Sequence, residues 1–447
     1  MWEPCIVNRL YDIIPAMRVQ LFTLLLSAIA VFSTKGLGPS FAASSEQYDR
    51  NWPQWRGPAG NGLVLHGSPP LEWSEEKNVK WKVAIPGLGH ATPIVWENKI
   101  LVLTAVPVEG NDMKFAFTVL CLDRRSGQTL WKKVARQDAA HQDIQPTNSR
   151  SSGSPVTDGE HLMVSFGSYG LYCFDLDGNL KWERDLGKVN VTWGESSSPA
   201  LVGDTAIVIQ DNNKASYIHA FDKKTGRELW TKKRDEGSSW TTPFVLERGG
   251  KTQVIVNGAK AVRSYDPENG EVLWQCSGLG INVIPMVVVD QNAVYAMSGQ
   301  RTSPMAMAIK LGGAGDLTGT DAVLWKFTRG TSYVSSPLLY DGLLYFFQHI
   351  NALITCLDAA TGQPHFLQER LEGVTTIYSS PIGMNNRIYV VGREGTTAVL
   401  EKSKELKVLA RNKLDDGFDA SPAVVGNELF LRGRSKLYCI AETSSSR

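Results

Sequence analysis

A short pattern ending in Leu-Trp recurs along this chain of 447 residues. In each copy an apolar residue precedes Asp, and two variable residues, a small polar residue and Gly follow. Such repetition is typical of proteins built from copies of one supersecondary unit. Full copies are Cys121–Trp131 (CLDRRSGQTLW), Ala220–Trp230 (AFDKKTGRELW) and Ser264–Trp274 (SYDPENGEVLW), and variants are Cys173–Trp182, one residue shorter, and Cys356–Phe366, with Phe in place of Trp.

A second element, a Ser/Thr-Pro step followed by alternating apolar residues, lies upstream of these copies. Proline lacks a backbone donor and favours the first residue of a strand. Turn pairs such as Gly-Asp then lead into a second alternating strand. Asp and Gly of the first pattern make the next turn, and Leu-Trp begins a fourth strand. Eight prolines mark eight such units: Pro93, Pro155, Pro199, Pro243, Pro285, Pro337, Pro381 and Pro422.

Each unit is thus expected to be a four-stranded antiparallel sheet with two apolar faces, which it cannot bury alone. Eight such sheets packed radially predict an all-β fold, an eight-bladed β-propeller. The last unit ends after Lys436–Glu442 without an outer strand, whereas Asn78–Ile85 (NVKWKVAI) precedes the first unit and carries a similar Lys-Trp. We expect this N-terminal strand to complete blade eight and close the ring.

These repeats resemble the quinoprotein-type (PQQ-like) repeat over roughly residues 78–442. They are similar to those of quinoprotein alcohol dehydrogenases and of BamB-type outer-membrane assembly propellers. The segment WPQWRGP, residues 52–58, looks like the leader of secreted propellers of this type. The resemblance implies the fold, but one fold hosts many activities.

The N-terminus carries a candidate secretion signal. Val19–Ser33 is an apolar run shorter than a membrane-spanning helix needs, and Arg18 precedes it. Small residues at Ser40 and Ala42 favour cleavage after Ala42, with Met17 as a possible alternative start, and an uncleaved anchor is the competing interpretation. The predicted organisation is a signal peptide over 1–42, an arm over 43–77, the propeller over 78–442 and a polar tail over 443–447. The protein would be periplasmic or secreted.

The charge balance limits the classes of binding partner, and the cysteine positions indicate whether disulfides are expected. Without residues 1–42 the chain has equal numbers of acidic and basic residues, so no basic footprint for nucleic acid or anionic lipid is expected. Cys121, Cys173 and Cys356 share one repeat position, a small buried strand site, and Cys439 falls at the corresponding place. No disulfide framework follows. A monomer is expected.

Catalytic and metal-binding patterns are absent from the sequence. The histidines show no metal-ligand spacing, and no nucleophile elbow or phosphate-binding glycine loop occurs. The resemblance to the dehydrogenases implies pyrroloquinoline quinone against a Trp and a ring of two adjacent cysteines, with Ca²⁺ held by Glu and Asn. No Cys-Cys pair is present, and the nearest match is Val191–Pro199, in which Trp193 and Glu195 would face the channel. We predict no catalytic residue, no metal and no cofactor, with PQQ and Ca²⁺ as the alternative.

Residues just ahead of each inner strand are expected to ring the mouth of the central channel, where they would bind a polar ligand or an extended peptide or merely cap the channel with water. Two insertions, Gln137–Ser149 and Gly299–Thr320, would lengthen blades one and five. The channel-mouth candidates are His90, Asn148, Arg150, Trp193, Glu195, Trp240, Asn282, Tyr333, Tyr378 and Asp419.

The segment Asn51–Gly62 (NWPQWRGPAGNG) belongs to no repeat. Its prolines prevent a regular strand, yet Trp52 and Trp55 are costly to leave in water. We expect an irregular arm laid on the propeller near blades eight and one, with Arg56 paired to a carboxylate or a backbone carbonyl. The alternative is an exposed aromatic site for a glycan or a partner.

Two functional hypotheses follow. We favour an exported, non-catalytic propeller that binds an envelope protein or a polar small ligand at the cell envelope. The alternative is a PQQ-dependent alcohol or sugar dehydrogenase with an atypical site.

Overall fold

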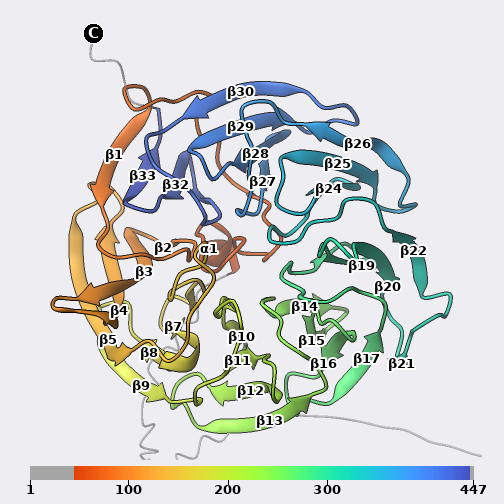
Figure 1. Ribbon diagram of the computed structural model, residues 1–447, viewed down its shortest axis with the longest axis horizontal. Helices are drawn as coiled ribbons and strands as arrows, with labels where there is room; N and C mark the ends of the chain where they lie inside the picture. The colour runs from red at the N-terminus through yellow and green to blue at the C-terminus, as the bar shows by residue number, and fades with distance from the viewer. Residues whose placement is uncertain (1–44, 443–447) are drawn as a thin grey trace, which may run out of the picture. The chain divides into compact units, whose positions relative to one another are not determined.

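The computed structural model describes residues 45–442. Figure 1 shows small sheets set around a central axis. Residues 45–442 form eight sheets, each with four strands in antiparallel order and one with a short fifth strand, so the predicted eight-bladed β-propeller is confirmed. Among these residues no helix is long and apolar enough to cross a membrane. The predicted signal peptide and polar tail lie outside the described residues.

In each blade the first strand lies nearest the axis and the fourth lies at the rim (Figure 1). Blades one to four contain β2 (Ile94–Trp96), β3 (Lys99–Val108), β4 (Asn111–Asp123) and β5 (Thr129–Ala139); β6 (Val156–Thr157), β7 (Leu162–Ser165), β8 (Leu171–Phe174) and β9 (Leu180–Arg184); β10 (Ala200–Val202), β11 (Thr205–Gln210), β12 (Ser216–Asp222) and β13 (Glu228–Arg234); and β14 (Phe244–Arg248), β15 (Lys251–Val256), β16 (Val262–Tyr265) and β17 (Val272–Cys276).

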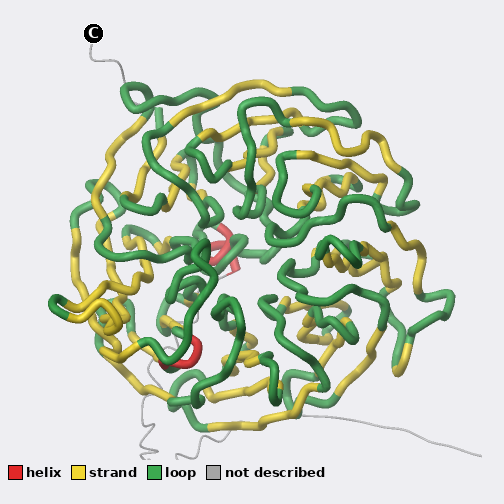
Figure 2. The backbone as a smooth tube through the Cα atoms, in the orientation of Figure 1, coloured by secondary structure: helices red, strands yellow, loops and turns green. Residues whose placement is uncertain are grey.

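Blades five to eight follow the same order. They contain β18 (Val288–Val289), β19 (Ala293–Ser298), β20 (Met305–Lys310) and β22 (Val323–Phe327); β23 (Leu338–Tyr340), β24 (Leu343–Phe347), β25 (Leu353–Asp358) and β26 (Pro364–Arg370); β27 (Ile382–Met384), β28 (Arg387–Val391), β29 (Thr396–Glu401) and β30 (Val408–Lys413); and β31 (Ala423–Val425), β32 (Glu428–Arg432), β33 (Lys436–Ile440) and β1 (Val79–Ala84). Figure 2 shows the described helical segments, α1 (Ser45–Asp49) and the 3₁₀ turn η1 (Gly167–Tyr169), in red.

The Asp-x-x-x-Gly pattern makes the turn between the third and fourth strands. Asp123 Oδ1 accepts hydrogen bonds from the backbone N–H groups of Arg125 and Ser126 at 3.0 and 2.8 Å and from the Ser126 hydroxyl at 2.8 Å. Gly127 follows with a φ of 74°, a conformation that glycine adopts without strain. These carboxylates therefore fix turns, as their regular recurrence indicates.

The tryptophan that starts one outer strand docks on the turn of the next blade. Trp131 Nε1 donates a hydrogen bond to the Leu176 carbonyl at 3.2 Å, and a Cβ added to Gly178 would lie 2.9 Å from the indole. Only glycine leaves room for a ring this close. The same contact is made by Trp81 on blade one, Trp182 on blade three, Trp230 on blade four and Trp325 on blade six.

A small buried residue of the third strand lies opposite each of these tryptophans. Burial raises the pKa of the Cys121, Cys173 and Cys356 thiols to about 12. All cysteines of the described segment are free and buried, so no disulfide is found there. The cross-strand pairs are Cys121 with Trp131, Cys173 with Trp182, Ala220 with Trp230, Ser264 with Trp274, Ala308 with Trp325, Cys356 with Phe366 and Cys439 with Trp81.

The two ends of the propeller meet in blade eight. Strand β1 pairs antiparallel with β33, from Val79 opposite Ile440 to Ala84 opposite Lys436. The expected closure by an N-terminal outer strand is therefore confirmed.

One expected insertion is placed differently. Residues 299–320 were expected to lengthen blade five, but they include β20, which is its regular third strand. The additional segment follows β20 and forms β21 (Gly315–Asp316), which pairs in parallel with β17 and gives blade four a fifth strand. Strand β20 was not predicted from the sequence, because its Met-Ala repeats lack the β-branched residues that favour strands.

We predict that deleting β1 destabilises the whole ring, because it exposes the edge of β33 and removes the contact of the half-buried Trp81, a loss that alone costs roughly 1–3 kcal/mol. Thermal unfolding and light scattering should show a lower midpoint and aggregation. Lys80→Ala, which keeps the strand, is the control. A deletion variant that melts like the wild type would show that β1 does not close the ring.

Candidate functional site

Ser and Thr residues directly before the repeat prolines link neighbouring blades around the axis. Thr92 N–H donates to Ser154 Oγ at 2.9 Å, and Ser154 N–H donates to Ser198 Oγ at 2.9 Å. Equivalent bonds run from Ser198 to Thr242, from Ser336 to Ser380 and from Ser380 to Ser421. We call these side chains the hydroxyl ring: Thr92, Ser154, Ser198, Thr242, Ser336, Ser380 and Ser421. The bonds explain why Ser or Thr precedes the repeat proline, a role that the sequence alone did not reveal.

The N-terminal arm crosses the axis. Trp52 exchanges two backbone hydrogen bonds with Val95 of blade one, at 3.0 and 2.9 Å, and its side chain is fully buried. The Pro53 carbonyl accepts Thr157 N–H of blade two at 2.9 Å. The backbone of Gly62 bonds Gly383 of blade seven at 2.9 Å. An arm on the edge or one face near blades eight and one was expected, and the arm contacts further blades because it crosses the axis.

Arg56 fixes the bend of the arm from inside the protein. Its Nη2 donates to the carbonyls of Asn61 and Pro337, each at 2.7 Å. The expected pairing with a backbone carbonyl therefore occurs. Burial lowers the pKa of the Arg56 guanidinium to about 9. Next to this bend, a Cβ on Gly57 would lie 2.8 Å from the Trp52 ring, so the arm needs glycine there.

A cavity of about 360 Å³ lies on the axis, and Trp55 of the arm is part of its wall. Trp55 Nε1 donates to Ser421 Oγ at 3.3 Å. Five hydroxyls of the ring also line the cavity: Thr92, Ser154, Ser198, Ser380 and Ser421. Seven of the ten channel-mouth candidates lie around it, namely His90, Asn148, Trp193, Trp240, Tyr333, Tyr378 and Asp419.

One position relative to the repeat proline contributes to the wall of this cavity in most blades. The residue three positions before the proline faces it in seven blades, because an extended chain turns every second residue to the same side. The residue at this position in blade five, Asn282, has a φ of 56° and does not line the cavity, and Ile284 takes its place. Those that do line it are His90, Ser152, Ser196, Trp240, Val334, Tyr378 and Asp419.

A strap, residues 140–149, covers the other end of the cavity. It contains most of the insertion expected over 137–149, of which the first three residues belong to β5. Thr147 Oγ1 lies 3.1 Å from the hydroxyl of Tyr378 in blade seven, and Asn148 Nδ2 donates to the Trp193 carbonyl at 2.7 Å. The strap bonds residues ahead of the prolines, whereas the backbone of the arm bonds residues after them. The strap and Trp55 of the arm thus both contribute to the wall of the cavity.

The charged corner of the cavity is held internally. Asp419 accepts hydrogen bonds from Arg393 and Arg434, the latter through Nε at 2.8 Å, and lies 3.4 Å from His90 Nε2. Burial alone raises the pKa of Asp419, but these partners bring it below its usual value. Burial, reinforced by the nearby arginines, lowers the pKa of His90 to about 4 despite Asp419. At neutral pH, His90 is therefore uncharged and Asp419 is ionised.

Aromatic rings form much of the remaining wall. Trp193 and Trp240 stack with ring centroids 5.4 Å apart and an interplanar angle of 28°. The Arg393 guanidinium lies 4.1 Å from the centre of the Tyr378 ring. Tyr333 stacks on His349 at 4.9 Å. These contacts hold the rings in fixed positions around the cavity.

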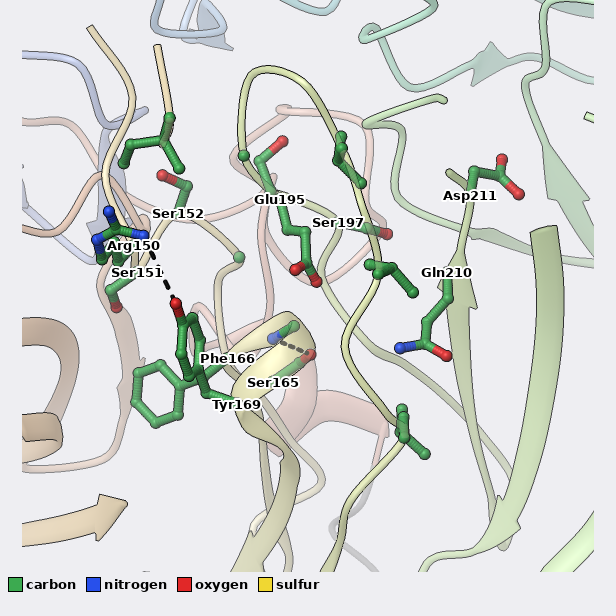
Figure 3. Close-up of a pocket in the computed structure, with 18 of the residues that line it drawn as sticks. Arg150, Ser151, Ser152, Ser165, Phe166, Tyr169, Glu195, Ser197, Gln210 and Asp211 are labelled. Atoms are coloured by element: carbon green, nitrogen blue, oxygen red, sulfur yellow. Dashed lines mark hydrogen bonds between the residues drawn. The ribbon is translucent and has the colours of Figure 1, made fainter. Parts of the chain in front are cut away.

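Arg150 and Glu195, which were expected at the channel mouth, lie instead around a smaller side cavity of about 50 Å³ (Figure 3). Arg150 Nη1 is 3.5 Å from the Tyr169 hydroxyl. The Glu195 carboxylate accepts the backbone N–H of Ser168 at 2.7 Å and its hydroxyl at 2.5 Å. Both residues line the side cavity and neither lines the central one.

The cavity does not fit a quinone with its calcium ion. The stacked indoles offer a face for a flat ring, but the candidate calcium ligand Glu195 is bound to Ser168 in the side cavity. Within residues 45–442, no three His, Cys, Asp or Glu side chains lie close enough together to hold a metal ion.

Sequence comparisons place the chain among known propellers. Residues 71–188 and 116–368 match the model of a family described as outer membrane protein assembly factor BamB. The outer membrane protein assembly factor BamB of Yersinia pestis is 21% identical over 285 residues, which cover 62% of this chain and 65% of that protein. Tetrathionate hydrolase of Acidithiobacillus ferrooxidans is 27% identical over 231 residues, which cover 48% of this chain and 41% of that protein. The chain thus spans less than two thirds of either relative.

A solved structure shares the fold. Quinohemoprotein alcohol dehydrogenase from Comamonas testosteroni matches with a TM-score of 0.61 at 10% identity, over 91% of this chain and 82% of that one. At this identity the likeness concerns the fold alone.

We predict that Trp52→Ala lowers the free energy of unfolding by roughly 3–5 kcal/mol, because it empties a fully buried site between the arm and β2. Trp55→Ala should cost less, since Trp55 is half-buried beside the cavity. Denaturant unfolding measures both, with Trp193→Ala as a control on the opposite wall. If Trp52→Ala unfolds like the wild type, the arm does not stabilise the ring.

A second prediction concerns Glu195. Burial raises the pKa of its carboxyl to about 7, although the Ser168 hydrogen bonds oppose the shift. The native state therefore favours the protonated carboxyl. The free energy of unfolding falls as pH rises from 4.5 through about 7, because the carboxyl must then lose its proton in a buried site. Glu195→Gln should raise the melting temperature relative to wild type above pH 7 but not near pH 4.5, by roughly 1–3 kcal/mol in unfolding free energy. The exposed Glu183→Gln is the control, and a pH-independent difference would contradict the assignment.

Proposed function

This chain belongs to the family of the outer membrane protein assembly factor BamB, and we propose that it is an exported, non-catalytic β-propeller that binds or scaffolds other proteins at the cell envelope. The observation that carries the proposal is the family match, which extends over most of the ring. The apolar segment Val19–Ser33, predicted to be a secretion signal, supports export. The chain without residues 1–42 has no net charge, which favours protein or small-molecule partners over nucleic acid. We propose that the protein acts as a monomer.

A second candidate function is a quinone-dependent oxidoreductase. The stacked Trp193–Trp240 pair on the axis and the shared fold with a quinohemoprotein alcohol dehydrogenase favour it. Two observations argue against a quinone site. Glu195, the candidate calcium ligand, lines the side cavity, and the sequence has no adjacent cysteines. We therefore propose that the protein works without PQQ and without a bound metal.

Capture from the native envelope tests the proposal. The full chain, tagged at its C-terminus and cross-linked in intact cells, should recover defined envelope proteins in a fixed ratio. The destabilised Trp52→Ala variant should lose them. Recovery of the chain alone, under conditions in which a known envelope complex is captured, would contradict the scaffold function.

A titration with PQQ and Ca²⁺ tests the second candidate. We expect no saturable change in quinone absorbance and no dye-linked alcohol oxidation by the purified protein. Stoichiometric quinone uptake that Trp193→Ala abolishes would instead establish an oxidoreductase.

A further inference from the structure

The hydroxyl ring presents unused donors to the central cavity. Ser154, Ser198, Ser380 and Ser421 each accept a backbone N–H or an indole N–H through Oγ. Within the described residues, the hydroxyl protons of these four side chains find no acceptor, and all four residues line the cavity. A hydroxyl that accepts one hydrogen bond keeps its own proton to donate. The cavity wall therefore favours a ligand rich in acceptor oxygens.

Within residues 45–442 the hydroxyl ring is interrupted twice: Ile284 stands in place of Ser or Thr in blade five, and the Thr92 hydroxyl of blade one accepts no N–H from blade eight. Thr92 is 1% exposed and lines the cavity, yet its Oγ1 has no hydrogen-bond partner among the described residues. A buried hydroxyl without a partner costs free energy, and natural proteins rarely leave one unpaired. The Ser and Thr counterparts of Thr92 accept an N–H from the preceding blade. In the described chain the Thr92 Oγ1 atom has no such partner and is buried beside the cavity, so a rotation of the side chain toward the cavity would bring this donor to a ligand.

The aromatic side chains of the cavity wall are suited to stack on the flat, weakly polar face of a cyclic ligand. Trp193 and Trp240 are fixed by mutual stacking, and Trp240 Nε1 donates to the Gly194 carbonyl at 2.5 Å. Tyr378 is held from one side by Arg393. Aromatic faces carry negative potential and attract C–H groups that bear a small positive charge. Fixed rings of this kind stack without a further loss of side-chain freedom.

The charges of the cavity disfavour an ionised ligand. Asp419 lines it, but its carboxylate is already bound by Arg393 and Arg434. His90 is neutral at pH 7 because burial lowers its pKa to about 4. No other Asp, Glu, Lys or Arg of the described chain lines this cavity. An ionised ligand would lose its hydration without gaining a free counter-charge.

We propose that the central cavity binds an uncharged, polyhydroxylated ring compound of one or two sugar units. At about 360 Å³ the cavity is within the range of small-molecule sites. Hydroxyl donors, the unpaired Thr92 hydroxyl and fixed aromatic faces together match such a ligand, and residues of the strap over 140–149 form part of the wall. The inference deepens the proposed function, since it gives the binding propeller a ligand class.

Glucose, N-acetylglucosamine and maltose are the probes, with glucuronate and glucosamine as charged comparators. We expect at least one neutral sugar to give saturable heat in calorimetry with the purified full chain at millimolar concentration. The same sugar should change the fluorescence of the cavity indoles, and the charged comparators should bind more weakly. No saturable binding of any neutral sugar, or equal binding of glucuronate, would overturn the proposal.

A matched pair of variants locates the site. Thr92→Val and Thr397→Val each remove a buried hydroxyl that has no partner among the described residues, but Thr397 lies in β29 away from the cavity. Thr92→Val should weaken sugar binding roughly five- to tenfold, as expected for one hydrogen bond. Thr397→Val should leave it unchanged. Equal affinity of both variants and wild type would place the ligand elsewhere.

Trp193→Ala provides a second variant on a half-buried loop residue, and it should reduce binding while the protein stays folded. Normal binding by this variant would also contradict the site. Sugar binding is measured on the isolated protein and partner capture in the envelope. Failure of one experiment therefore leaves the other conclusion standing.

Discussion

The packing of one indole on one glycine turn holds neighbouring blades together, and the ring depends on this contact. A lone four-stranded sheet cannot bury both of its faces, so each blade needs a neighbour at a fixed distance. Trp131 sets that distance by lying against Gly178 and donating to the Leu176 carbonyl. The opposite residue, Cys121, must be small, because the indole and the next blade occupy the space.

Where the repeat lacks this tryptophan, the arm supplies one. In blade seven the corresponding outer-strand residue is Ala410, paired with Val399. Trp73 of the arm stacks on Tyr389 of that blade at 6.3 Å, and its backbone N–H donates to Asn412 Oδ1 at 2.8 Å. The arm therefore places an indole on blade seven and also bounds the central cavity.

The fold was predictable because every blade repeats its own turn and strand signals, so that an error in one copy is corrected by the others. The cavity was partly predictable, since residues three positions before the proline share one direction. Glu195 and Tyr333 both lie four positions before their prolines, yet only Tyr333 lines the central cavity, and Asn282 has a left-handed backbone. These differences depend on loop geometry that composition does not encode. The course of the arm was not predictable, because a segment without a repeat has no register. Burial of Trp52 followed from its size, but its pairing with Val95 did not.

The union of β1 with β33 has a consequence for biogenesis. The first strand of the propeller pairs with the last, so Val79 has no partner until Ile440 has been synthesised. The hairpins of blades one to seven form from neighbouring residues, whereas blade eight waits for the whole chain. Contacts of such long sequence separation form late and slowly. Until β33 is made, β1 and the edge of the growing ring can pair with strands of other chains. Correct assembly therefore depends on keeping incomplete chains apart from one another.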